Sequence, residues 1–208
     1  MTKAPPAIKI IVGGAFMQYD IYKQARNAAW EFLIKNNITQ LPVSLSAICA
    51  QNGITLLRDN SRTYLTDNDR GATYFRNGTY SIVLNCSDPV QVQRYTTAHE
   101  LGHIFLKHPM KSGRYGRSFG VQREPRSPME YQAERFAIDI LAPACVLWGL
   151  NLHTAEDIAS VCNISIQAAT IRAERMEMLY KRNMFLSHPL ERQIFQQFSK
   201  FVENNQII

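Results

Sequence analysis

Residues 96–109 read Thr-Thr-Ala-His-Glu-Leu-Gly-His-Ile-Phe-Leu-Lys-His-Pro, and residues 99–103 within them match the H-E-x-x-H pattern. Apolar and aromatic residues recur every three or four positions here, at Val92, Tyr95, Ala98, Leu101 and Phe105. This is the spacing of an amphipathic helix, and Pro109 is expected to end it. The sequence therefore predicts one helix that carries both histidines of the motif.

The spacing of the motif suits a zinc site. Two histidines four residues apart lie one helical turn apart on the same face, so His99 and His103 can both reach one Zn²⁺. Glu100 then stands beside the metal, where a general base can take a proton from zinc-bound water and pass it to a leaving amide nitrogen. The alternative is a pair of hydrogen-bonded helix histidines with a solvated glutamate.

A catalytic zinc site also needs a third protein ligand and an open position for water. His108 is the nearest histidine, but Pro109 follows it, and Leu106 stands where the H-E-x-x-H-x-x-G-x-x-H class has glycine. Glu130 is the better candidate, because two protein ligands alone would bind zinc poorly. It lies on a helix expected to run from Ser127-Pro128 to Leu141, before Pro143.

Glu130 has an alternative role, because Ser127 and Glu130 are spaced as a capping box. Glu134, one turn further, could accept a hydrogen bond from a zinc-bound imidazole, or it could be solvated or pair with Arg126 or Arg135. No single residue is indicated as the donor that stabilises the transition state. The candidates are Tyr95, His108, Tyr115 and Tyr131, each of which could equally be a packing or surface residue.

The rest of the chain reads as mainly α-helical with a small antiparallel sheet, an α+β fold. Asn77-Gly78 is a strong signal for a type I′ turn and predicts a hairpin of strands 73–75 and 80–84. A strand or arm is expected at 10–17, helices at 19–36 and 44–52, a strand at 54–57, a mobile basic loop at 107–126, a helix pair at 154–161 and 165–180, and a last helix at 190–202.

Composition narrows the class of protein. The chain has 208 residues, 46% of them hydrophobic and 19% charged, which excludes a disordered or fibrous chain. A net charge of +6 is compatible with nucleic acid, anionic lipid or an acidic partner without choosing among them. The four cysteines form no C-x-x-C pair, so a zinc knuckle or a disulfide scaffold is not indicated. The apolar run at 10–17 is too short to span a bilayer, and no convincing cleavage site follows it, so we expect a cytoplasmic protein without a membrane partner.

The motif helix and the Glu130 helix together resemble the ImmA/IrrE family of zinc metallopeptidases. The likeness rests on residues 96–103 and on Glu130-x-x-Ala133-Glu134-x-Phe136-Ala137-x-x-Ile140-Leu141-x-Pro143. It extends to Leu41-Pro42-Val43, Gly53-Ile54 and Ile82-Val83-Leu84-Asn85, and so covers roughly residues 15–180. One departure is Glu134, where the family often has asparagine or aspartate.

The resemblance implies a gluzincin-like peptidase with one Zn²⁺ per chain, held by His99, His103 and Glu130, and with Glu100 as the base. It implies a zincin-like metallopeptidase domain at 1–145, followed by a C-terminal helical region at 146–208 with a helix-turn-helix-like pair. Members are typically cytosolic proteins of bacteria or mobile elements that cleave a helix-turn-helix repressor. Mn²⁺ could also occupy such a site.

The helix pair has two interpretations. DNA binding would need Gln167, Thr170 and Arg172 to reach base edges in a major groove. Packing on the zinc domain, or gripping a repressor, is favoured, since four acidic side chains on the pair would repel phosphate: Glu156, Asp157, Glu174 and Glu177.

The leading hypothesis is a zinc-dependent endopeptidase that cleaves a helix-turn-helix transcriptional repressor. The alternative is a non-catalytic zinc-containing regulatory protein that binds a repressor or DNA through its C-terminal helices. A secreted general protease is disfavoured, because the sequence lacks a convincing signal peptide and a disulfide framework.

Overall fold

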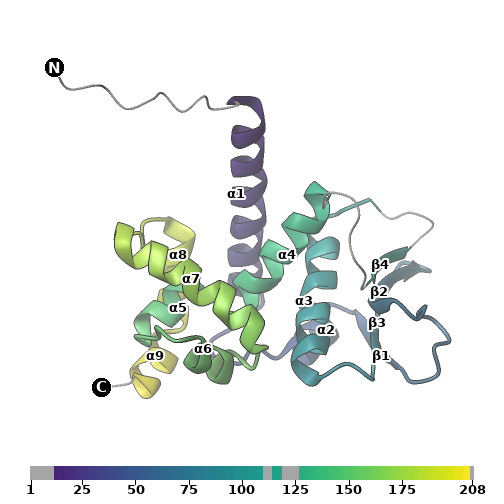
Figure 1. Cartoon of the computed structure of the whole chain (residues 1–208). Coiled ribbons are helices and arrows are strands. Elements are labelled where there is room, and N and C mark those ends of the chain that lie inside the picture. Colours follow the sequence, from purple (N-terminus) through teal and green to yellow (C-terminus); the bar gives the residue numbers. More distant parts are fainter. Residues whose placement is uncertain (1–11, 110–113, 119–126, 207–208) are drawn as a thin grey trace.

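The computed structural model describes the backbone of residues 12–109, 114–118 and 127–206, and the side chains of 20–109 and 127–206. Helices and one small sheet lie side by side, with the sheet next to α3 and the C-terminal helices on the other side of α4 (Figure 1). The helices are α1 Val12–Lys35, α2 Leu45–Gln51, α3 Val90–Phe105, α4 Pro128–Leu141, α5 Ala144–Gly149, α6 Ala155–Cys162, α7 Ile166–Arg182, α8 Pro189–Gln197 and α9 Ser199–Asn205. The expected α+β class is confirmed.

The sheet contains β1 (Thr55–Asp59), β2 (Asp69–Arg76), β3 (Thr79–Asn85) and β4 (Arg114–Ser118), in the order β1-β3-β2-β4. The predicted hairpin is present: β2 pairs antiparallel with β3, and Asn77 and Gly78 both have positive φ, as a type I′ turn requires. The expectation of a purely antiparallel sheet is wrong, because β1 pairs parallel with β3. After β1 the chain forms β2 and then turns back as β3, which lies between the two. β1 and β3 therefore run in the same direction, and β1 lies at one edge of the sheet.

Two local expectations are corrected. β4 lies inside the segment expected to be a basic loop and pairs antiparallel with β2, with Gly116 opposite Ala72. Its sequence lacks alternating apolar residues, so only the pairing with β2 identifies it. The expected strand or arm at 10–17 is helical from Val12 onward, because a short apolar run fits a helix as well as a strand. Residues 10, 11, 110–113 and 119–126 lie outside the described residues.

The helix that carries the motif packs between the sheet and α4 (Figure 1). α3 and α4 approach closely at Gly102, where an added Cβ would lie 3.0 Å from the Cα of Ala133. A glycine at this position allows backbone-to-backbone contact that a larger residue would prevent. The close approach brings the first turn of α4 beside the motif histidines.

Buried side chains from both predicted parts of the chain form one hydrophobic cluster, which extends from Ala29 on α1 to Val202 on α9. α5, which the sequence did not predict, spans the expected boundary at residue 145. The expected last helix is divided at Phe198 into α8 and α9. The division into domains at 1–145 and 146–208 stays a prediction.

The helix pair is present as α6 and α7, capped by Thr154 and Ser165 and joined through Asn163 in the left-handed conformation. Arg172 is only 2% exposed and its guanidinium donates to Asp139 on α4 at 3.1 Å. It is therefore not available to read base edges, whereas Gln167 and Thr170 are exposed. None of the described helices is long and apolar enough to span a membrane.

Candidate metal centre

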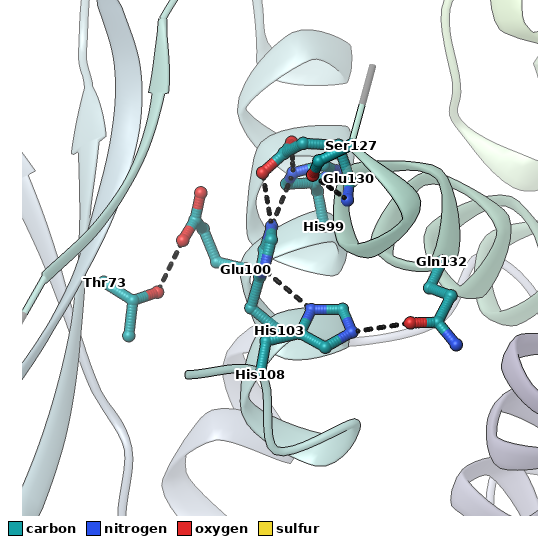
Figure 2. Close-up of polar contacts among 8 residues, drawn as sticks. All are labelled: Thr73, His99, Glu100, His103, His108, Ser127, Glu130 and Gln132. Atoms are coloured by element: carbon teal, nitrogen blue, oxygen red, sulfur yellow. Dashed lines mark hydrogen bonds and ion pairs between the residues drawn. The ribbon is translucent and has the colours of Figure 1, made fainter. Parts of the chain in front are cut away.

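The side chains of His99, His103 and Glu130 converge at the contact between α3 and α4 (Figure 2). The Nε2 atoms of the two histidines lie 3.1 Å apart. The Nε2 of His99 lies 3.1 Å from Oε2 of Glu130, and the Nε2 of His103 lies 3.3 Å from Oε1. The spacing within α3 and the close α3–α4 contact thus bring together the three residues that the sequence singled out.

These three donors fit a zinc ion. With bonds of about 2.0–2.2 Å in a tetrahedral site, neighbouring donor atoms lie roughly 3.3–3.6 Å apart, close to the spacings here. Two imidazoles and one carboxylate are the donor set of a catalytic zinc site and leave a fourth position for water. Both histidines are buried, and the side chain of Glu130 is 35% exposed, so solvent can reach the site on the glutamate side.

Glu130 combines both roles that the sequence allowed. Its backbone N–H donates to Oγ of Ser127 at 3.3 Å, as expected at the start of a capped helix. Its carboxylate faces the histidines instead. Burial alone would raise the pKa of Glu130, but hydrogen bonds from His103 and His99 outweigh it and hold that pKa well below its usual range. The side chain is therefore a carboxylate, the form that binds metals.

Glu100 is fully buried and directed towards the sheet side of the site (Figure 2). The hydroxyl of Thr73, on β2, donates to Oε2 of Glu100 at 2.6 Å. This contact joins residues 27 positions apart, which is why the sequence did not indicate Thr73. The only available signal was a polar residue at the start of the strand predicted at 73–75.

His108 lies beside His103, and not among the three converging donors. Its Nδ1 is 2.9 Å from Nδ1 of His103, and its Nε2 is 3.0 Å from Oε1 of Gln132 on α4 (Figure 2). The side chain is buried, and burial together with the neighbouring His103 lowers the pKa of His108. The imidazole is therefore positioned to act on His103 through a hydrogen bond.

Three other sequence candidates lie on a neighbouring surface. Tyr95, Tyr131 and Glu134 line a cavity of about 530 Å³ that α7 also borders, through Ala168 and Ile171 among others. Their expected roles in supporting a histidine or stabilising a transition state stay predictions. The side chain of Tyr115 lies outside the described residues.

Comparison with known proteins agrees with this geometry. No curated protein matches the chain. The sequence model of the IrrE N-terminal-like domain family, Peptidase_M78, matches residues 49–174, which include both site helices and the sheet. That match covers more than half of the chain, and this protein therefore belongs to the IrrE N-terminal-like family of metallopeptidase type.

Proposed function

We propose that this protein is a zinc-dependent endopeptidase whose substrate is a helix-turn-helix transcriptional repressor in the cytoplasm. The observation that carries the proposal is the convergence of His99, His103 and Glu130, with donor atoms 3.1–3.3 Å apart and Glu100 next to them. The family supports peptide-bond chemistry, and the resemblance described above supports a repressor as the substrate.

His99, His103 and Glu130 would hold the metal. A bound Zn²⁺ supplies a Lewis acid that polarises a carbonyl and lowers the pKa of water. Glu100 is the base: its carboxylate takes a proton from the attacking water and returns it to the amide nitrogen as the peptide bond breaks. Glu100 is 0% exposed, so its carboxylate is enclosed by the protein and held in one place beside the metal site.

Thr73 orients that carboxylate. Because the threonine hydroxyl donates to Oε2, the plane of the Glu100 carboxylate is fixed relative to β2 and α3. The other oxygen, Oε1, is then presented in a defined direction. Such fixed placement lowers the entropy lost when the reacting groups come together.

A protein substrate also suits the surroundings of the site. The cavity beside it has walls from α3 and α4, which carry the site, and from α7 of the helix pair. A folded partner that contacts the helix pair would therefore lie beside α4, the helix that supplies Glu130. The burial of Arg172 supports a protein-gripping role over DNA reading for this pair.

The test compares wild type with Glu100→Gln. Each purified protein is loaded with Zn²⁺, its metal content is measured, and it is added to a cell extract in which new protein N-termini are labelled and sequenced. Both proteins should hold one zinc. Wild type should create new N-termini at a rate about 10²–10⁴ times that of the variant. Fragments from a helix-turn-helix protein would support the proposed substrate.

Glu177→Gln is the matched control, because Glu177 is an exposed glutamate whose partner is Lys181 on the same helix. It should cleave like wild type. Equal cleavage by wild type and Glu100→Gln would contradict the role of Glu100. Zinc binding without cleavage by either protein would favour the non-catalytic regulatory alternative, and wild type without zinc would contradict the metal site.

A further inference from the structure

His108 reaches His103 because of the way α3 ends. The helix ends at Phe105, and Lys107 adopts a positive φ of 55°. The N–H of Lys107 donates to the carbonyl of Ile104, and the N–H of His108 donates to the carbonyl of His103. This pair of hydrogen bonds is a Schellman motif, which folds the chain back over the last turn. Its geometry returns the His108 imidazole to the side of His103.

Four side chains then form a hydrogen-bonded chain that begins at the metal centre. The Nδ1 atoms of His103 and His108 lie 2.9 Å apart. Nε2 of His108 lies 3.0 Å from Oε1 of Gln132, and the amide nitrogen of Gln132 donates to Oε1 of Gln24, on α1, at 3.2 Å. Nδ1 of His103 and both nitrogens of His108 thus face another member of the chain, which leaves Nε2 of His103 for the metal.

Only one arrangement of protons satisfies this chain when a metal is bound. A metal on Nε2 of His103 requires that the proton of this imidazole be on Nδ1. Nδ1 of His108 must then accept, so the proton of His108 is on Nε2 and is donated to Gln132. The amide oxygen of Gln132 accepts, and its NH₂ group donates onward. Gln132 therefore accepts from His108 and donates to Gln24, which matches the direction of donation that the metal imposes on His103.

We propose that His108 is a positioning residue that holds His103 in its metal-binding tautomer and orientation, and that Gln132 fixes the tautomer of His108. This inference rests on the proposed zinc site. A second imidazole takes the place that a carboxylate or a backbone carbonyl occupies beside many metal-bound histidines. Because a neutral imidazole accepts only when its other nitrogen is protonated, the support depends on Gln132 as well.

The test measures zinc affinity, which does not require peptidase activity. Wild type, His108→Phe, Gln132→Leu and Gln132→Glu are titrated with Zn²⁺ against a chromogenic chelator of known affinity. His108→Phe keeps a ring of similar size and should bind zinc about 10–100-fold more weakly. Gln132→Leu should also bind more weakly. Gln132→Glu keeps the acceptor and should bind at least as tightly as wild type.

A second readout follows the tautomers. In ¹⁵N-histidine spectra of the zinc-loaded protein, His103 should be protonated on Nδ1 and His108 on Nε2. His153→Phe is the matched control, because His153 forms a hydrogen bond with Asn151 and takes no part in the site. Circular dichroism checks that every variant is folded, and Gln132→Leu keeps the test informative if His108→Phe is not.

The outcomes separate the inference from the proposed function. Zinc affinity of His108→Phe and Gln132→Leu within twofold of wild type would overturn the inference and leave the zinc site intact. An equal loss in Gln132→Glu and Gln132→Leu, or a His108 protonated on Nδ1 in the zinc form, would also overturn it. Wild type that binds no zinc would overturn the proposed function, and the inference with it.

Discussion

At the scale of single residues, the site depends on side chains that hold other side chains. The motif residues supply two metal donors and the base. The orientation of Glu100, however, depends on Thr73 on β2, a strand that packs on the side of α3 away from α4. Both residues are fully buried. A carboxylate that is removed from water needs such a donor, because a buried charge without hydrogen bonds is costly.

The contact between Thr73 and Glu100 gives a direct prediction. Thr73→Val keeps the shape of the side chain and removes the hydroxyl that donates to the carboxylate. We expect the free energy of unfolding to fall by about 1–3 kcal/mol, since the buried acceptor loses a hydrogen bond to a charged group. Zinc content should not change, because Thr73 contacts none of the three donors. Urea unfolding and elemental analysis measure the two effects.

Thr73→Ser is the control for this prediction, because it keeps the hydroxyl and loses only a methyl group. It should lose less stability than the valine variant and should keep the rate of peptide cleavage closer to that of wild type. A valine variant as stable and as active as the serine variant would contradict a role for the hydroxyl.

The residues show what the sequence could and could not predict. His99, His103 and Glu100 follow from local spacing on one helix, and a start signal and the need for a third ligand indicated Glu130. Thr73 and the partnership of His108 with Gln132 depend on which elements pack together, which spacing within one element does not report. The sequence did name His108, as a third ligand that it disfavoured and as one of four candidate transition-state donors, but it could not show that the turn after α3 brings His108 beside His103.

At the scale of elements, α4 is joined to α7 by buried charges. Asp139 on α4 accepts from Arg135 through both carboxylate oxygens, at 2.6 and 2.7 Å, and from Arg172 on α7 at 3.1 Å. Arg135 also lies over the ring of Tyr22 on α1, with its Cζ 4.4 Å from the ring centre. The helix that supplies Glu130 is thus connected to α1 and to the helix pair through one aspartate.

Asp139→Ala should therefore be strongly destabilising. It leaves two guanidinium groups without their shared carboxylate, and that of Arg172 is fully buried. Breaking a buried ion pair from one side costs about 3–5 kcal/mol, because the remaining charge is left uncompensated. The measurement is the free energy of unfolding in urea, taken without metal so that zinc binding does not contribute.

Glu177→Ala is the matched control for the buried pair. Glu177 and Lys181 form an i,i+4 pair on the same α7 helix, with side chains 65% and 72% exposed. An exposed pair of this kind contributes little to stability, so the control should unfold almost like wild type. Similar losses in the two variants would mean that the Asp139 pair stabilises the fold no more than a surface pair does.

Some helices and strands could be predicted from the sequence, and others could not. α4, α6 and α7 begin at side-chain caps and α3 shows helical periodicity, and each of these four helices was predicted within a few residues. β4 was not, because it pairs with β2 through backbone atoms and shows no apolar alternation. The parallel pairing of β1 depends on the order of strands in space, which no short stretch of sequence contains.

At the scale of the whole molecule, one hydrophobic cluster includes buried side chains from α1 to α9. Three cysteines are buried within it at distant positions, Cys49, Cys145 and Cys162. Burial raises the pKa of Cys49 to about 11 and that of Cys162 to about 12, and it also raises the pKa of Cys145. Near neutral pH all three are protonated thiols, which react slowly with thiol reagents.

These thiols can report whether residues 1–145 and 146–208 unfold together. A cluster shared by both parts favours one cooperative transition, so all three cysteines should become reactive over the same range of urea concentration. The measurement is pulse labelling with an alkylating reagent at each urea concentration, followed by mass spectrometry of the peptides. Cys86, which is only partly buried, should react in the folded protein and serves as the internal reference.

A split result would support the two predicted domains instead. Cys49 lies in the first predicted part and Cys162 in the second, so separate unfolding would make one of them reactive at a lower urea concentration than the other. Cys145 lies at the expected boundary and would follow the part with which α5 unfolds. Because the cluster contains side chains from both parts, we expect coincident labelling: exposing either part would remove apolar contacts from the other and destabilise it.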